Sequence, residues 1–388
     1  MCRFVPGQVL AIGPLHALRE MGNGLPGSTA IDPFVPENAD VEPDSPFQGL
    51  GVLVLTTDPG LELLALSRLS AQLAGAINRK QAVVDLNHLL PLGSAPYPTN
   101  GLRLSPRSER EVQALRQFVR ARWSGSPGTT TRVAVIDSGL HPDFAPHRSV
   151  TYLDYTAATV SLEAPRADPL GHGTRVVKLL DELLPMDVEL VVGRLPGDSQ
   201  SVTVLGVARA FGDLVARTKP DVVNLSLALR DDAFTCPACR KRVPVPGFVP
   251  SFFPMLVSLA GRCERATVTV LAAGNSGQVS NSRWVTPDTD AMVIAIAENR
   301  HGDRARYSGA PTGPLADLLS ASAFGGDDPD ETGFVGVFED GGYGTSFAAP
   351  FLSAAALLAR QRTTPMPPHM PPQLGLNIRH VLAMARRF

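Results

Sequence analysis

The stretch TRVAVIDSG, residues 131–139, contains a short apolar run, Arg132–Ile136, that ends directly in Asp137, Ser138 and Gly139. Runs of β-branched residues that are apolar on both faces are typical of central strands in a parallel sheet. Four further runs of this kind follow along the chain: Glu189–Gly193, Asp221–Leu225, Thr267–Ala272 and Met292–Ala297. Segments with helical periodicity alternate with them: Arg175–Leu184, Val202–Thr218, Phe252–Arg262 and Ser346–Gln361. The alternation predicts an α/β fold with a doubly wound, mostly parallel sheet.

The residues before this stretch have a different pattern and predict a small separate α/β domain over residues 1–100. Its expected elements are strands at Gln8–Ile12, Gly51–Thr56 and Ala82–Leu86, a helix at Leu61–Ile77, and a long loop at Gly24–Phe47. A proline-rich linker, Pro91–Pro106, leads into a larger domain over residues 105–388. That domain is expected to start with a helix near Ser108, where Glu111 completes a capping box, and to end with a helix at about Asn377–Arg387.

Composition excludes several classes of protein. The 388 residues are 44% hydrophobic and 19% charged, which is a globular profile, and the formal net charge of −2 argues against a nucleic-acid partner. No run of about 18 apolar residues is present, so no membrane span is expected. Four cysteines are too few for a disulfide scaffold. A signal peptide is disfavoured because Pro6, Gln8 and Pro14 interrupt the first apolar stretch, so a cytoplasmic location is expected.

Reactive side chains lie at strand ends and helix starts. Asp137 follows the first strand of the larger domain, Asn275 follows the strand TVTVLA, and His172 and Ser346 open two helices. Since ligands bind beyond the carboxyl ends of parallel strands, these groups are expected at one edge of the sheet. A serine needs a base to become a nucleophile, which His172 can supply while Asp137 holds the imidazole. The backbone N–H of Ser346 and the Asn275 carboxamide can then bind an oxyanion.

The motifs DSG, GHGT, AAGNSG and GTSFAAP occur in that order and resemble those of the subtilisin-like serine protease family (subtilases, peptidase S8). The resemblance implies a serine endopeptidase acting on protein or peptide substrates, with Asp137, His172 and Ser346 as the triad. It makes Asn275 the oxyanion donor and places Ser226, Leu227, Ala228 and Gly274 along the substrate. The opening FVPGQVL is similar to that of some subtilisin propeptides, so the N-terminal domain is expected to dock on the larger domain and to restrain it.

The chain departs from the family pattern in two places. Ala228 and Leu229 stand where the family usually has glycine, which puts the shape of the substrate groove in doubt. The stretch Arg230–Gly261 is longer than usual and contains the CPAC motif. Cys236 and Cys239, with Cys263 as a third ligand, resemble half of a zinc knuckle, but a reduced loop and a reversible disulfide are alternative interpretations.

Simpler interpretations remain for each group. Ser346 can be a helix N-cap, His172 a buried structural histidine and Asp137 a strand-end turn residue. The acidic loop with Asp327, Asp328, Asp330 and Glu331 is interpreted as solvated in preference to a calcium site. No metal or cofactor is predicted. Two other functions compete: a catalytically silent protease-like binding protein, and a nucleotide-binding α/β protein, which lacks the phosphate loop it would need.

Overall fold

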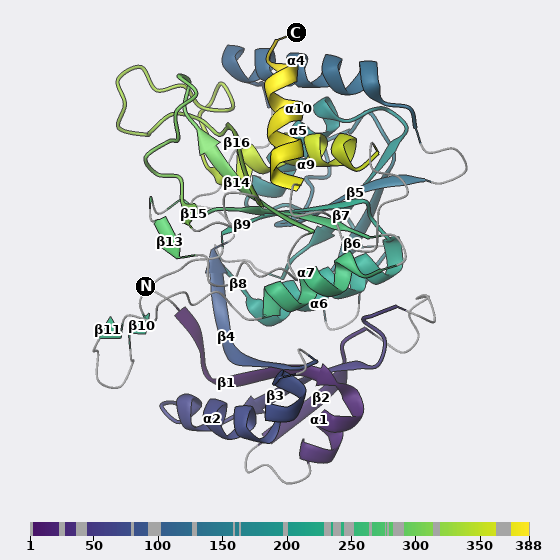
Figure 1. Cartoon of the computed structure of the whole chain (residues 1–388), viewed down its shortest axis with the longest axis vertical. Helices are drawn as coiled ribbons and strands as arrows, with labels where there is room; N and C mark the ends of the chain where they lie inside the picture. Colours follow the sequence, from purple (N-terminus) through teal and green to yellow (C-terminus); the bar gives the residue numbers. More distant parts are fainter. Residues whose placement is uncertain are drawn as a thin grey trace.

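The fold is described from a computed structural model of the chain (Figure 1). The structure describes residues 3–22, 28–35, 45–78, 81–91, 102–125, 130–157, 160–162, 164–196, 201–228, 234–235, 242–243, 252–263, 266–275, 277, 279–281, 291–312, 319–361 and 374–387.

A sheet of seven parallel strands forms the centre of the larger domain, in the order β16-β14-β12-β9-β5-β7-β6. Its strands are β5 (Thr131–Asp137), β6 (Val150–Asp154), β7 (Val188–Arg194), β9 (Val222–Ala228), β12 (Val268–Ala272), β14 (Met292–Glu298) and β16 (Ser320–Phe324). The five apolar runs expected to be central strands all lie in it. The order reverses around β5 and β9, so the predicted doubly wound fold is confirmed.

Helices cover both faces of this sheet (Figure 1). On one face lie α4 (Pro106–Arg122), α5 (His172–Leu183), α9 (Thr345–Gln361) and α10 (Leu374–Ala385), which share one hydrophobic core. On the other face lie α6 (Val204–Thr218) and α7 (Phe252–Gly261), which share a second core. Each β-strand therefore buries both of its faces, which explains why these strands are continuous apolar runs. None of the described helices has the length and apolar character required to cross a membrane.

A second, antiparallel sheet has the order β2-β3-β1-β4-β8 and forms the core of a small N-terminal domain. Its elements are β1 (Arg3–Pro14), α1 (Leu15–Gly22), β2 (Ser28–Pro33), β3 (Leu50–Thr56), α2 (Glu62–Gln72), α3 (Ala74–Asn78) and β4 (Val83–Pro91). The last strand, β8 (Ser201–Thr203), comes from the larger domain and pairs with Leu89–Pro91 of β4. The two domains thus share a sheet at this point.

The N-terminal domain packs against α6 and α7 of the larger domain (Figure 1). Ile12 and Phe34 belong to the same buried cluster as Phe211 of α6. The ring of Phe34 lies so close to Gly212 that a Cβ there would approach its Cε1 to 2.0 Å. Polar contacts add to the interface, because the Leu205 N–H donates to Asn87 Oδ1 at 3.3 Å.

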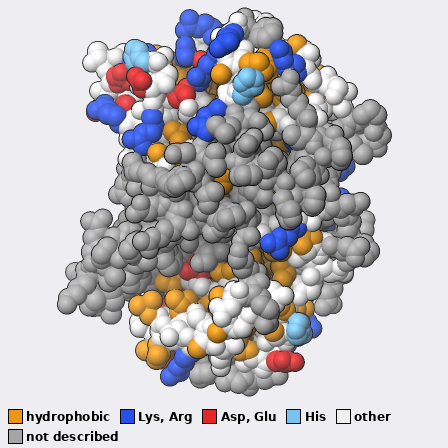
Figure 2. All heavy atoms as spheres, in the orientation of Figure 1, with side chains coloured by type: hydrophobic (Ala, Val, Ile, Leu, Met, Phe, Trp, Pro, Cys, Tyr) orange, Lys and Arg blue, Asp and Glu red, His pale blue; other side chains and the backbone are white. Residues whose placement is uncertain are grey.

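The far side of the N-terminal domain presents apolar side chains to solvent. Figure 2 shows hydrophobic side chains gathered over this domain, in the lower part of the view, whereas charged side chains gather over the larger domain. Leu61, Leu63 and Leu64, at the start of α2, are about half-exposed. Ala65 and Leu69 of the same helix are buried in the core of the N-terminal domain. Helix α2 therefore has apolar residues on both its buried and its exposed sides.

Several expected elements differ from the structure. The first helix of the larger domain begins at Pro106, with Ser105 as its N-cap, because Pro106 at the first helical position is preorganised for a helix and needs no N–H partner. The expected loop Gly24–Phe47 contains β2, and the expected helix Leu61–Ile77 divides at Leu73 into α2 and α3. Strands β6 and β16 lie in segments where the sequence predicts no strand.

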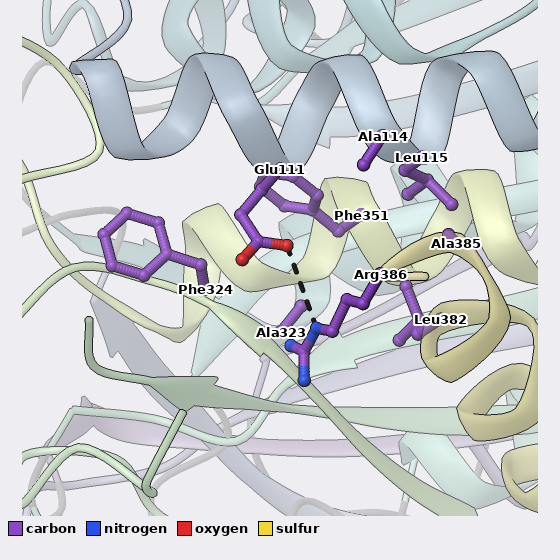
Figure 3. Close-up of a pocket in the computed structure, with 9 residues that line it drawn as sticks. All are labelled: Glu111, Ala114, Leu115, Ala323, Phe324, Phe351, Leu382, Ala385 and Arg386. Carbon is purple, nitrogen blue, oxygen red and sulfur yellow. Dashed lines mark ion pairs between the residues drawn. The ribbon is translucent and has the colours of Figure 1, made fainter. Parts of the chain in front are cut away.

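Shorter elements complete the described chain: β10 (Phe234–Thr235) pairs with β11 (Arg242–Val243), and β13 (Val279–Asn281) pairs with β15 (Ala310–Thr312). A small pocket lies where α10 meets α4, α9 and β16 (Figure 3). Arg386 beside this pocket pairs with Glu298 and lies 3.8 Å from Glu111. The pocket is lined by Ala114, Leu115, Phe324 and other mostly apolar side chains, and it contains none of the reactive groups expected from the motifs.

Candidate active site

Asp137 and His172 form a buried pair at the carboxyl edge of the parallel sheet. Asp137 is the last residue of β5, and its Oδ1 lies 2.7 Å from His172 Nδ1 at the start of α5. The exposed fractions of the two residues are 0% and 3%. A carboxylate at Nδ1 favours the tautomer with the proton on that nitrogen, so that Nε2 is left as the basic atom. The pair therefore has the geometry of an oriented general base.

The pair is held by a second carboxylate that the motifs did not reveal. Asp168, also buried, accepts hydrogen bonds from the N–H of Gly171 at 2.9 Å and of Thr174 at 2.7 Å, at the start of α5. It also accepts from the Ser138 hydroxyl at 2.7 Å. Asp168 thus ties the first turn of the His172 helix to the residue that follows Asp137. Gly171, the N-cap residue, has no side chain that could cap the helix, so Asp168 supplies the cap from three residues upstream, where no N-cap pattern in the sequence marks it.

The environment raises the pKa of His172 above its ordinary value of 6.5. Burial is the largest influence and lowers the pKa, because a charged imidazole loses its hydration. The charge of Asp137, its hydrogen bond and the charge of Asp168 together outweigh burial, while the cation of Arg175 acts against them. The site therefore stabilises an imidazolium, which is the form that a general base reaches after it accepts a proton.

Ser346 lies in the first turn of α9, where backbone N–H groups have no partner inside the helix. Its neighbour Phe347 brings the helix to His172, since their ring centroids are 5.6 Å apart. Two reciprocal hydrogen bonds of 2.9 Å connect Ser346 to Ser226 at the end of β9. The Ser346 hydroxyl donates to the Ser226 carbonyl, and the Ser226 hydroxyl donates to the Ser346 carbonyl.

The sequence of α9 explains why the Ser226 hydroxyl donates to the Ser346 carbonyl. Pro350 stands four residues after Ser346 and has no N–H, so the Ser346 carbonyl lacks the usual helical donor. The Ser226 hydroxyl takes that place from the neighbouring strand. Ser226 is 3% exposed and its hydroxyl is bonded inside the protein, so its side chain is not available to a substrate.

Asn275 follows β12 and is exposed beside the start of α9. Its Oδ1 accepts hydrogen bonds from the Thr345 N–H at 2.9 Å and from the Thr345 hydroxyl at 3.1 Å. These donors fix which end of the carboxamide is oxygen, and Nδ2 remains as a donor. A Cβ on Gly344 would lie 2.8 Å from Nδ2, and the φ of that residue is +147°, so glycine is required there. Asn275 and Ser346 therefore meet at the first turn of α9, and the contact with Phe347 places His172, with Asp137 bound to it, beside that turn.

The expected substrate-binding residues lie near this turn, but their role stays a prediction. Pairing of β9 with β5 ends at Asn224, so Ser226 and Leu227 extend past the last β5 partner. Leu227 is buried, and Ala228 pairs with Ala272 of β12. The Gly274 N–H donates to the Thr345 hydroxyl at 3.0 Å, and the Gly274 carbonyl accepts from the Gly309 N–H at 2.7 Å.

The acidic loop is solvated only in part: Asp330 is 73% exposed and Glu331 is partly exposed, as expected, whereas Asp327 and Asp328 are buried, contrary to the solvated interpretation. Asp327 is fully buried and accepts from the backbone N–H groups of Arg300 and Val335, each at 2.8 Å. Asp328 is 5% exposed and pairs with Arg306 at 3.3 Å. Arginine and backbone donors therefore occupy these carboxylates.

Cys236 and Cys239 lie outside the described residues. Cys263 contacts the Leu259 carbonyl at 3.7 Å. Within the part of the chain that the structure describes, no three or more His, Cys, Asp or Glu side chains are grouped as metal ligands would be.

Comparison with known proteins places the chain in a family. The model of the subtilase family, Peptidase_S8, matches residues 128–386. The prenylagaramide maturation protease PagA is 20% identical over 67% of this chain and 85% of its own, with a TM-score of 0.45. A cold-adapted subtilisin-like serine proteinase is 20% identical over 64% of this chain and 80% of its own, with a TM-score of 0.43.

A protease of Pseudoalteromonas arctica PAMC 21717 is 19% identical over 69% of this chain and 89% of its own, with a TM-score of 0.44. No curated protein is similar enough to count as a match. The family model spans most of the chain and contains Asp137, His172, Asn275 and Ser346. The chain therefore belongs to the subtilase family and is a serine-type peptidase.

Proposed function

We propose that the protein hydrolyses internal peptide bonds of protein or peptide substrates through an acyl-enzyme on Ser346. The observation that carries the proposal is the buried Asp137–His172 pair, 2.7 Å between Oδ1 and Nδ1, beside the first turn of the helix that bears Ser346. Nucleophile, base and orienting acid are then supplied by α9, α5 and β5. The raised pKa of His172 suits a base that must carry a proton during the reaction.

The reaction starts with a rotation of the Ser346 hydroxyl. A hydroxyl has one proton, so the Ser346 proton must leave the Ser226 carbonyl before it can pass to His172 Nε2. Ser346 Oγ then attacks the scissile carbonyl. The resulting oxyanion is bound by the Ser346 N–H and by Asn275 Nδ2, with support from the dipole of α9.

His172 next donates its proton to the leaving amine, which leaves an acyl ester on Ser346. A water molecule, deprotonated by the same imidazole, hydrolyses the ester and restores the enzyme. Throughout this cycle Asp137 keeps Nδ1 protonated and stabilises the imidazolium.

Labelling with a fluorophosphonate probe, together with peptide hydrolysis, tests the assignment. The wild type is expected to form a covalent adduct and to cleave peptides, and Ser346→Ala is expected to do neither. Ser124→Ala, which alters an exposed serine after α4, is the matched control and should behave as the wild type. Full hydrolysis by Ser346→Ala would refute the nucleophile, and a wild type that neither labels nor cleaves would favour a catalytically silent binding protein.

The proposal extends to the N-terminal domain, which we assign an inhibitory role. The end of β4, Leu89–Pro91, pairs with β8, and β4 also contacts β9, whose last residues lie beside Ser346. Strand β4 therefore lies next to the end of β9, where an extended substrate is expected to pair with Ser226–Ala228, so the strand and the substrate would compete for this edge. Because the domain is tethered, even weak docking is highly populated.

Gly212→Ala tests this role without deleting any segment. The added Cβ would collide with Phe34, so the N-terminal domain is displaced, whereas alanine is the better helix former and favours α6 itself. Peptidase activity is expected to rise. The double variant Phe34→Ala, Gly212→Ala has room for the Cβ but also loses the Phe34 contact, so its activity is expected to rise as well, and only its stability reports any effect within α6. Unchanged activity in Gly212→Ala, with the N-terminal domain shown by limited proteolysis to have loosened, would contradict the inhibitory role.

A further inference from the structure

A fully buried cation lies one turn after the candidate base. Arg175 has an exposed fraction of 0% and is the largest side chain buried to that extent among the residues that the structure describes. It stands three residues after His172 on α5, so both side chains extend from the same face of the helix. Neither the motifs nor the proposed reaction assigns it a role.

The partner of Arg175 is a carboxylate on a tight turn. Asp340 faces the guanidinium with both oxygens: Oδ1 accepts from Nη1 at 2.9 Å, and Oδ2 accepts from Nη2. The turn around Asp340 is closed by hydrogen bonds between the backbones of Phe338 and Gly341, at 3.0 and 3.1 Å. Asp340 is attached to the segment that leads into Ser346, so the ion pair connects the His172 helix to the Ser346 segment.

Aromatic rings connect the same two segments. The Arg175 guanidinium lies 4.6 Å from the centroid of Phe338, and Phe338 meets Phe347 edge-on at 5.6 Å. Phe347 in turn contacts His172 at 5.6 Å between ring centroids. His172, Phe347, Phe338 and Arg175 therefore contact one another in sequence, and the first and last of them are joined by the backbone of α5.

We propose that Arg175 and Asp340 are positioning residues that fix the distance between His172 and Ser346. This inference rests on the proposed triad. A buried guanidinium without its carboxylate is strongly unfavourable, so α5 and the turn are held together. The turn holds Phe338 against Phe347, and Phe347 directly follows the nucleophile. Displacement of the turn therefore shifts Ser346 relative to Nε2, and a displacement of about 1 Å can reduce turnover by about 100-fold.

Asp340 is the better residue to change, because it is 40% exposed and its replacement leaves no cavity in the core. Asp340→Ala removes the pair, and Asp340→Asn keeps the shape and part of the hydrogen bonding. Glu339→Ala removes the adjacent exposed carboxylate from the same turn and is the matched control. Turnover is measured per fluorophosphonate-reactive site, so that unfolded molecules do not count.

Asp340→Ala is expected to lower kcat about tenfold or more with KM within about twofold, while Asp340→Asn recovers part of the loss and Glu339→Ala has no effect. If the pair acts as a unit, Asp340→Ala causes little further loss in an Arg175→Met background. An Asp340→Ala enzyme with wild-type kcat per site would overturn the positioning role, as would a loss in KM alone. Should Arg175→Met fail to fold, the Asp340 and Glu339 variants still decide the question. A wild type that neither labels nor cleaves would instead overturn the triad, and this inference with it.

Discussion

Ser226→Ala should slow the enzyme because it removes the donor that replaces a missing helical N–H. In α9 the carbonyl of Ser346 would normally accept from residue 350, but that residue is proline. The Ser226 hydroxyl fills the gap at 2.9 Å from the carbonyl. Without it, the first turn of the nucleophile helix loses its tie to β9 and the Ser346 backbone becomes less ordered.

The magnitude follows from the cost of an unpaired carbonyl. A buried acceptor that loses its partner costs about 1–3 kcal/mol. Ser346 is only half-buried, so the lower half of that range applies, and about 1.4 kcal/mol corresponds to tenfold in rate. Ser226→Ala is therefore expected to lower kcat by up to about tenfold and to reduce the free energy of unfolding by about 1–2 kcal/mol.

A double-mutant cycle with Pro350→Ala isolates this hydrogen bond. Alanine at position 350 restores an N–H that can reach the Ser346 carbonyl, so Ser226→Ala should cost less in that background. Ser226 Oγ also lies 2.8 Å from Asn224 Oδ1, which competes with the Ser346 carbonyl for the single hydroxyl proton, and Ser353→Ala is the control for the Asn224 contact. It breaks the bond between Asn224 and Ser353 while leaving the Ser346 carbonyl paired.

Unfolding by urea and kcat per fluorophosphonate-reactive site are the two measurements. A coupling energy near 1 kcal/mol lies outside the roughly 0.3–0.5 kcal/mol scatter of independent sites. Equal costs of Ser226→Ala in the wild-type and Pro350→Ala backgrounds would refute the reasoning, because the hydroxyl would then not be replacing the N–H that proline lacks.

Two further predictions concern the oxyanion donor and the base. Asn275→Ala should lower kcat by about 10²–10³ with little change in KM, a magnitude taken from the established subtilisin example of the same donor. Steady-state kinetics would argue against this role if KM rose at constant kcat. Because the pKa of His172 is raised, kcat/KM should increase with pH with a midpoint above 6.5, and Asp137→Asn should shift that midpoint downward. By linkage, the stability contributed by protonated His172 is present in full below pH 6.5 and is lost as the pH rises through the folded pKa. A pH–rate profile with its acidic midpoint below 6.5 would contradict the dominance of Asp137 and Asp168 over burial.

The central strands could be predicted because burial on both faces leaves an unambiguous apolar run, as in β5 and β7. Strand β16, SASAF, could not, because it is built largely of small residues with little β-propensity. Strand β2 lies within a proline- and aspartate-rich stretch and forms only through its pairing with β3. Local sequence does not encode such a partner.

The candidate site, like the strands, could be predicted only in part. Asp137, His172, Asn275 and Ser346 lie in motifs whose chemistry requires those residue types. Asp168 and Arg175 act through contacts that only folding creates: the first caps a helix turn, and the second reaches Asp340, which is far along the chain. Buried charges of this kind leave no periodic signal, so a sequence pattern cannot separate them from surface residues.

If the N-terminal domain inhibits the enzyme as proposed, the sheet it shares with the larger domain links its docking to the access of substrate. Strand β8 pairs with Leu89–Pro91 and, through Thr203, also caps α6, the helix against which Phe34 packs. Undocking of the domain therefore exposes a strand edge, the ring of Phe34 and the start of α6 together. A peptide that adds to the strand edge at Ser226–Ala228 gains backbone hydrogen bonds but not the apolar contact of Phe34. Under the proposed inhibitory role, substrates compete with the domain only for the strand, so weakening the Phe34 contact is expected to raise peptidase activity.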